Sequence, residues 1–437
     1  MSKAISKRAV LFFLIWLLKV PLAAQTQAEL LIKKAGLLEN HNWRISLISE
    51  MTKPLSQLRE KIERYAYRNE APHANEAQEI LLKIFLKKSA VYFLFINKVD
   101  GKYPEAARGN FLIRRSLLTG RFESILVFYR NEEGCYLELI AQGNNTLFNV
   151  YLFGRLQYKN LILPFRIDEY LKTSFANLIA MTWGRVAWEK LLLEAPRPED
   201  RQVEVLVQQL KERLPQINPK DDGAMDEKGR YVYIASGKMQ TNPLGFNCSG
   251  FVKWLTDGFY YNLTGRLLEL SRLKQKHPEL RGNRLTEKYD DERDPFFGLD
   301  WIRNCAVALY EAQTAQTNLA PTSRDIGVIE GFSYLKDIGF KISDLKQILF
   351  YLLQANPGKI YLGAVNYVSS KNPFYISYYH VLALIPYFDA QGEFRILVFD
   401  QHKDLSFDSF QKKYQNENIY LTQLDVTTGF SPIPLLD

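Results

Sequence analysis

The sequence has only three cysteines among its 437 residues. Three is an odd number, so at least one thiol is unpaired within the chain or pairs between chains. Basic residues exceed acidic ones by 56 to 48, but they form no dense run, and no nucleic-acid recognition motif accompanies them. Nucleic acid is therefore not an expected partner. The chain also lacks internal repeats and low-complexity tracts.

Long apolar runs are missing as well. The N-terminal apolar run covers only residues 9–18, follows three basic residues and precedes the small pair Ala23–Ala24. This layout predicts a secretory signal peptide over residues 1–24, because the run is too short to cross a bilayer comfortably. Lys19 in the segment leaves an uncleaved anchor as the alternative. Export predicts a periplasmic or cell-envelope location, and the basic balance suits association with an anionic envelope or membrane surface.

The length and the changes of pattern predict two domains of α+β class. Residues 26–90 repeat apolar positions three and four apart, which predicts helices. Between residues 90 and 167, short β-branched and aromatic runs separated by turn residues predict an antiparallel sheet of roughly five or six strands. One helix is expected over residues 169–194.

Pro196 and Pro198 mark the predicted linker. We therefore expect an α+β domain of unknown role over residues 25–195 and a second domain over residues 200–437. The acidic loop "KYDDERDPFFG", residues 288–298, lacks the spaced oxygen donors and the fixed glycine of a calcium loop. No metal site and no cofactor is predicted.

The stretch "NPLGFNCSGFVKWL", residues 242–255, is the most informative part of the chain. Asn247 is a favoured N-cap residue, which places Cys248 in the first turn of a helix. A helix N-terminus lowers the pKa of a thiol, and the backbone N–H of Cys248 would serve as an oxyanion donor. The apolar residues that follow predict one buried helix face with Cys248 at the exposed tip. Cys135 and Cys305 lie in apolar-patterned segments and are interpreted as inert, buried thiols.

A nucleophilic thiol needs a base, and His380 opens the predicted strand "HVLALIPYF". The turn "DAQGE" returns the chain along "FRILVFDQH", so a hairpin centred near residues 390–391 places His380 opposite Asp400 or Gln401. Asp400 would then orient the imidazole and stabilise the imidazolium. His402 lies two residues on and is the alternative third residue, because the register is not fixed by the sequence.

Together, "GFNCSGFV" and "YHVLALI" resemble the NlpC-type cysteine peptidases of the papain-like superfamily, whose motif is Cys-Ser-Gly preceded by Asp or Asn. The resemblance covers only the second domain and implies an α+β fold in which the cysteine caps a helix packed on an antiparallel sheet. It implies that Cys248 is the nucleophile and His380 the base. The family also has a tyrosine shortly before the cysteine that helps to form the oxyanion site, which corresponds here to Tyr233 or, alternatively, Tyr231.

The sequence departs from the family pattern in three ways. Asn247 stands where Asp is commoner, a change that the helix cap tolerates. His380 follows Cys248 by 132 residues, about twice the family's usual separation, so a long helical insertion is expected over residues 263–355. The third polar residue also follows the histidine after a longer interval than usual.

These features predict an exported thiol hydrolase, a peptidase or amidase that cleaves amide bonds of bacterial cell-wall peptides or a related amide substrate. Cys248 would attack the carbonyl, and His380 would take the thiol proton and return it to the leaving amine. Two alternatives stay open: an acyl-transferring or lipid-directed thiol enzyme on the same fold, and a non-catalytic envelope protein that uses the fold for binding or scaffolding. The oligomeric state is left open by the sequence.

Overall fold

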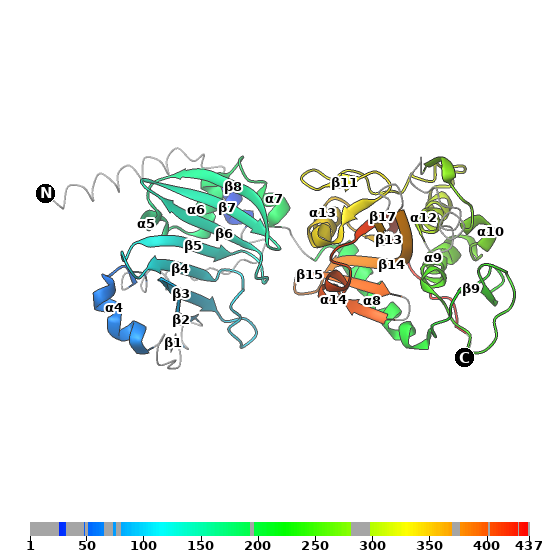
Figure 1. Ribbon diagram of the computed structural model, residues 1–437, viewed down its shortest axis with the longest axis horizontal. Coiled ribbons are helices and arrows are strands. Elements are labelled where there is room, and N and C mark those ends of the chain that lie inside the picture. Colours follow the sequence, from blue (N-terminus) through cyan, green and yellow to red (C-terminus); the bar gives the residue numbers. More distant parts are fainter. Residues whose placement is uncertain are drawn as a thin grey trace. The chain divides into compact units, whose positions relative to one another are not determined.

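The computed structural model describes residues 26–31, 48, 51–64, 73–75, 80–192, 196–280, 298–368, 376–400, 403–426 and 428–435. The chain divides into two compact units, Met1–Glu194 and Ala195–Asp437. Each unit combines helices with antiparallel sheet (Figure 1), which confirms the α+β class. The predicted signal segment, His402 and most of the acidic loop lie outside the described residues. Within the described ranges, no helix is both long and apolar enough to span a membrane.

The first unit contains an antiparallel sheet whose described strands follow one another in chain order (Figure 1). The strands are β1 (His73–Asn75), β2 (Ile80–Lys87), β3 (Ala90–Asn97), β4 (Phe111–Ser116), β5 (Phe122–Phe128), β6 (Tyr136–Gln142), β7 (Asn145–Leu152) and β8 (Arg155–Pro164). The described helices of this unit include α4 (Leu55–Ile62), α5 (Ile167–Tyr170), α6 (Phe175–Thr182) and α7 (Trp188–Leu191). The sheet thus has more strands than the sequence predicted.

Two predicted helices of this unit are wrong. The segment of β2 was expected to be helical, but its buried residues Ile80, Leu82 and Ile84 are spaced by two and it pairs along its whole length with β3. The single helix predicted over residues 169–194 is broken into α5, α6 and α7. Ser174 starts α6 by accepting a hydrogen bond from the Asn177 N–H, and Gly184, at φ +75°, turns the chain after it.

The second unit contains an antiparallel sheet of long and short strands in the order β11-β12-β17-β13-β14-β15-β16. Its strands are β11 (Tyr334–Leu335), β12 (Gly339–Lys341), β13 (Lys359–Val368), β14 (Ile376–Phe388), β15 (Phe394–Asp400), β16 (Lys403–Ser406) and β17 (Asn418–Asp425). A small separate pair, β9 (Gly223–Met225) and β10 (Tyr231–Tyr233), precedes them. The described helices include α8 (Pro198–Arg213), α9 (Cys248–Thr264), α10 (Leu270–Leu273), α12 (Leu299–Thr314), α13 (Leu345–Ala355) and α14 (Phe407–Lys413).

Helix α9 is the central helix of this unit. It packs against α12, β9 and β14 (Figure 1), and its residues from Cys248 to Phe259 are all buried. The sequence predicted that only one face of this helix is buried. Instead, α9 is buried on every side along its first three turns.

The segment expected to be an insertion, residues 263–355, contributes to the core of the unit. Helix α12 is buried from Leu299 to Leu309 and packs on β13 and β17. Strand β12 joins the sheet by pairing with β17. The described part of this segment therefore belongs to the core: α12 packs against α9 and the sheet, and β12 is a strand of that sheet.

Candidate active site

The first turn of α9 has the cap that the sequence predicted. Asn247 is the N-cap, with extended backbone, and its side-chain Oδ1 accepts a hydrogen bond from the Gly250 N–H at 2.8 Å. The cap satisfies one of the backbone donors that every helix N-terminus leaves unpaired. Cys248 is the first residue of the helix, next to the remaining donors and the positive end of the helix dipole.

The glycine of the Cys-Ser-Gly triplet is required by packing. A Cβ on Gly250 would overlap the carbonyl oxygen of Gly223 in β9 and would lie 3.0 Å from the Cα of Ala224. Only glycine lets the two backbones approach this closely. The carbonyl of Ser249 accepts a hydrogen bond from the Trp301 indole N–H at 3.0 Å, which ties the same turn to α12. The triplet is therefore fixed from two sides.

Cys248 lies at the helix start but not at an exposed tip. Its side chain is only 4% exposed, which corrects the expectation that the thiol faces solvent. Sγ is within hydrogen-bonding reach of the His380 imidazole, the backbone N–H of Val381 and the Ser249 hydroxyl. All three groups stabilise a thiolate more than a thiol, since each can donate a hydrogen bond to the anion.

His380 is held by an irregular part of β14. The strand begins at Ile376, so His380 is its fifth residue and does not open it as predicted. The pairing with β13 shifts between Val365 and Asn366, which oppose His380 and Tyr378, so that Tyr379 is the extra residue of a β-bulge. A bulge redirects the side chains beside it and is frequent next to active sites.

Asp400, at the end of β15, lies beside the imidazole. The β14–β15 register pairs Ala383 with Phe399, and continuing it places Asp400 opposite Leu382. Asp400 is thus the diagonal neighbour of His380 and not its direct partner as predicted, because the hairpin register differs from the expected one. Nε2 of His380 is 2.8 Å from Oδ1 of Asp400. The N–H at Nε2 is not directed well at that oxygen, so the contact is best described as an ion pair.

Lys413, the last residue of α14, and Tyr414, its C-cap, complete the surroundings of the imidazole. The ring of Tyr414 stacks on His380, with centroids 6.0 Å apart. Nζ of Lys413 lies 3.5 Å from Oδ2 of Asp400 and 4.7 Å from the centroid of the Tyr414 ring. Sequence reasoning missed both residues, because neither stands at a recognisable spacing from the cysteine or the histidine.

Burial and the interactions within this group shift the pKa values of its members in opposite directions. Burial raises the pKa of the Cys248 thiol, but the hydrogen bond and the charge of His380 outweigh it, so that the pKa lies below its ordinary value. Burial lowers the pKa of His380, but Asp400 and Cys248 together raise it to about 9. For Asp400, burial raises the pKa, but His380 and Lys413 lower it below the usual range. These directions favour a thiolate–imidazolium pair at neutral pH.

The tyrosines predicted for the oxyanion site have other partners. Both lie on β10, whose partner strand β9 packs against α9. The Tyr233 hydroxyl is 3.3 Å from the Thr241 Oγ1. Tyr231 is buried, and its ring stacks on Phe246 with centroids 5.3 Å apart. The assignment of either tyrosine as an oxyanion donor stays a prediction.

A pocket of about 720 Å³ reaches the candidate site from the side of His380 and Asp400. Its lining also includes Lys403, Lys413 and Glu417, but not Cys248. Solvent therefore approaches the imidazole and the carboxylate more freely than the thiol. The described residues include no cluster of three or more side chains suited to a metal ion.

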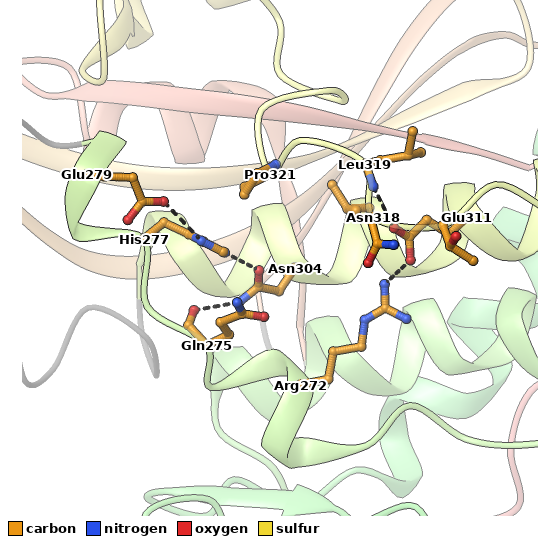
Figure 2. A pocket seen from close by; sticks show the side chains of 11 residues that line it. Arg272, Gln275, His277, Glu279, Asn304, Glu311, Asn318, Leu319 and Pro321 are labelled. Carbon is orange, nitrogen blue, oxygen red and sulfur yellow. Dashed lines mark hydrogen bonds and ion pairs between the residues drawn. The ribbon is translucent and has the colours of Figure 1, made fainter.

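Figure 2 shows a different pocket of the second unit, of about 610 Å³, around His277. Nε2 of the buried His277 lies 2.7 Å from Oδ1 of Asn304, and Nδ1 lies 3.7 Å from Glu279. On the opposite wall Arg272 pairs with Glu311. These polar side chains satisfy one another, so we interpret the pocket as structural. His277 has no part in the Cys248 site.

The cysteines outside the site form no disulfide bond with each other or with Cys248. Sγ of Cys135 accepts a hydrogen bond from the Phe153 N–H at 3.3 Å. Cys305 is buried in α12, and burial, followed by the charge of Asp257, raises the pKa of its thiol well above the ordinary value. This electrostatic contrast distinguishes Cys248 from Cys305.

A family model described as a domain of unknown function (DUF8515) matches residues 33–190. The match lies within the first unit, whereas Cys248, His380 and Asp400 all lie in the second. Neither a curated protein nor a solved structure matches the chain significantly.

Proposed function

We propose that the protein is an exported thiol hydrolase that cleaves amide bonds, with bacterial cell-wall peptides as the expected substrate class. The observation that carries the proposal is the group formed by Cys248, His380 and Asp400. A thiol at a helix N-terminus is hydrogen-bonded to an imidazole, and that imidazole pairs at 2.8 Å with a carboxylate. A nucleophile, a base and a group that orients the base are the components of thiol-dependent acyl transfer.

The reaction follows from these positions. The Cys248 thiolate forms a bond to the amide carbonyl carbon, and the electron pair of the carbonyl moves onto oxygen. When this intermediate collapses, the C–N bond breaks, and the His380 imidazolium gives its proton to the leaving amine. Water, deprotonated by the neutral imidazole, then attacks the thioester, which releases the acid and restores the thiol. Asp400 stabilises the imidazolium throughout.

The cell-wall substrate class is the less direct part of the proposal. It is supported by the predicted export signal and the net charge of +8 in the sequence, by the resemblance of the "GFNCSGFV" segment to NlpC-type peptidases, and by the packing of α9, with Cys248 at its N-terminus, on strand β14 of an antiparallel sheet. Among its described residues the first unit carries no comparable group, and we assign this unit a binding role toward envelope or partner only through its attachment to the second unit.

The test is to incubate the full-length protein with soluble cell-wall fragments and to follow the products by mass spectrometry. Amide hydrolysis adds one water per cleaved bond and creates one new amino group. Cys248→Ala, which removes only the sulfur, is the matched control and should give no product. An acyl transferase would instead join the acyl group to an added amine without uptake of water. Product formation that is equal in the wild type and Cys248→Ala would refute a thiol mechanism.

A further inference from the structure

The N-cap side chain holds a hydrogen-bond donor that the fold does not use. The Asn247 carboxamide accepts the Gly250 N–H through Oδ1 at 2.8 Å. Its Nδ2 is buried and has no hydrogen-bond partner among the residues that the structure describes. Asn247 as a whole is only 6% exposed. A buried amide donor without an acceptor destabilises the folded state, so its presence needs an explanation.

The unused donor lies at the reacting end of α9. Because Oδ1 binds the N–H of the third helical residue, the whole carboxamide is held over the first turn, the turn to which Cys248 belongs. The backbone N–H of Cys248, at the first helical position, also has no acceptor within the described ranges. Two N–H donors without acceptors therefore belong to the N-cap and first turn that carry the Cys248 thiol.

Other polar side chains near β10 are already engaged. Nε2 of Gln240 donates to the carbonyls of Val232 at 2.8 Å and Gly245 at 3.0 Å. The Tyr233 hydroxyl interacts with Thr241. These contacts hold the loop that leads into α9, and using the Gln240 amide for catalysis would break its two hydrogen bonds. The amide of Asn247 can be used at no such cost.

We propose that Nδ2 of Asn247 and the backbone N–H of Cys248 together form the oxyanion hole, and that Asn247 is thereby a catalytic residue as well as the helix cap. The inference rests on the proposed thiol mechanism and names the group that binds the carbonyl oxygen as it becomes negative. Two N–H groups at a helix N-terminus suit an anionic oxygen, because the helix dipole adds to both hydrogen bonds. Because the hydrogen bond from the Gly250 N–H fixes Oδ1, Nδ2 does not have to move when negative charge develops on the carbonyl oxygen.

The test uses an aldehyde, which adds to a thiol and gives a tetrahedral thiohemiacetal whose oxygen occupies the oxyanion position. The probe is N-acetylglycinal labelled with ¹³C at the aldehyde carbon. NMR of this carbon gives the affinity and the pH at which the thiohemiacetal oxygen ionises. Asn247→Ser is the informative variant, because serine is an equally favoured N-cap but has no amide donor. Asn247→Asp, nearly identical in shape, is the second variant if the serine protein folds poorly.

We expect the affinity of the wild type for the aldehyde to be roughly tenfold to a hundredfold higher than that of Asn247→Ser, and the ionisation of its thiohemiacetal to occur at lower pH. Asn247→Asp should lose affinity at least as strongly, because an oxygen replaces the donor. The rate of iodoacetamide alkylation, a displacement that develops no oxyanion, reports separately whether the thiolate has survived each substitution. This separates loss of the donor from loss of the nucleophile.

Two other outcomes would overturn the inference in distinguishable ways. Equal affinity and equal ionisation in the wild type and Asn247→Ser would remove Asn247 from the oxyanion hole but leave the Cys–His mechanism intact. Failure of the wild type to form any thiohemiacetal, together with an ordinary thiol pKa by alkylation, would refute the proposed function and this inference with it.

Discussion

Opposing effects on single residues decide whether Cys248 is reactive. His380 has a pKa raised to about 9, so its charge is present at neutral pH and is lost as the pH rises through that value. The pKa of Cys248 is lowered, so its thiolate persists to lower pH than that of an ordinary thiol and is lost as the pH falls through the lowered value. The ion pair therefore exists in the window between the two pKa values, and contributes to stability only there.

Asp400 is expected to control the position of this window. In Asp400→Asn the imidazolium loses its paired negative charge, so the pKa of His380 should fall and the pKa of Cys248 should rise. A rise of about one unit in the thiol pKa would slow alkylation at pH values below the midpoint by about tenfold. The measurement is the rate of iodoacetamide labelling of Cys248 between pH 5 and 10 in the two proteins.

Lys413→Met is the matched control for that experiment. Lys413 contacts the same carboxylate at 3.5 Å, but it is a cation. Its removal should leave Asp400 more available to the imidazolium, and the pKa of His380 should rise instead of fall. Shifts of the same sign in both variants would show that they act through a change of structure and not through charge.

The residues of the candidate site could be proposed from the sequence, but their environment could not. Asn247 before Cys248 is a local capping signal, and the apolar run after His380 indicates a strand, so both could be recognised within a few residues. The burial of Cys248 depends on packing against β14 and α12, which are far away in the sequence. The diagonal placement of Asp400 depends on a hairpin register that apolar alternation alone does not fix.

Among the elements, α9 depends on a close approach to β9. Gly250→Ala should destabilise the protein by about 1–3 kcal/mol, because the new Cβ overlaps the Gly223 carbonyl and forces the two backbones apart. The loss is measured as a change in the free energy of unfolding in urea. Gly327→Ala is the control, since a Cβ there meets no atom within 4 Å. Equal effects of the two substitutions would contradict the packing role of Gly250.

Helix α12 is joined to the sheet by a buried ion-pair network. Arg303, 1% exposed, binds Asp325 at 2.9 Å and donates to the hydroxyl of Tyr420 in β17 at 2.9 Å. Arg303→Met should cost about 3–5 kcal/mol of unfolding free energy, because it leaves the Asp325 charge buried and unpaired. Tyr420→Phe, which removes hydrogen bonds but no charge, should cost about 1–3 kcal/mol. An Arg303→Met protein as stable as the wild type would contradict this account.

Element types were predicted best where one pattern dominated. The helix predicted to follow Asn247 corresponds to α9, and the strand predicted from His380 lies within β14. The apolar residues of β2 fit a helical spacing as well as a spacing of two, and only its pairing with β3 decides between them. The interruption at Gly184 was overlooked because apolar and aromatic residues recur on both sides of it and favour a continuous helix.

At the scale of the whole molecule, the candidate site belongs to one unit and the family match to the other. The change from apolar and aromatic strands to a Pro-rich segment indicated two domains, and the structure divides at Glu194 and Ala195. The sequence predicted a long insertion between Cys248 and His380, but α12 and β12 are parts of the core and sheet of that unit. Sequence separation alone does not distinguish an added layer from a core element.

The most direct test of the account is the pH dependence of iodoacetamide alkylation at Cys248 in the full-length protein, compared with His380→Ala. Peptide mass mapping separates Cys248 from Cys305, whose raised pKa should make it label slowly. We predict a midpoint for Cys248 well below the ordinary thiol pKa of about 8.5, and a higher midpoint in His380→Ala. A midpoint at or above about 8.5 in both proteins would contradict a working Cys–His pair.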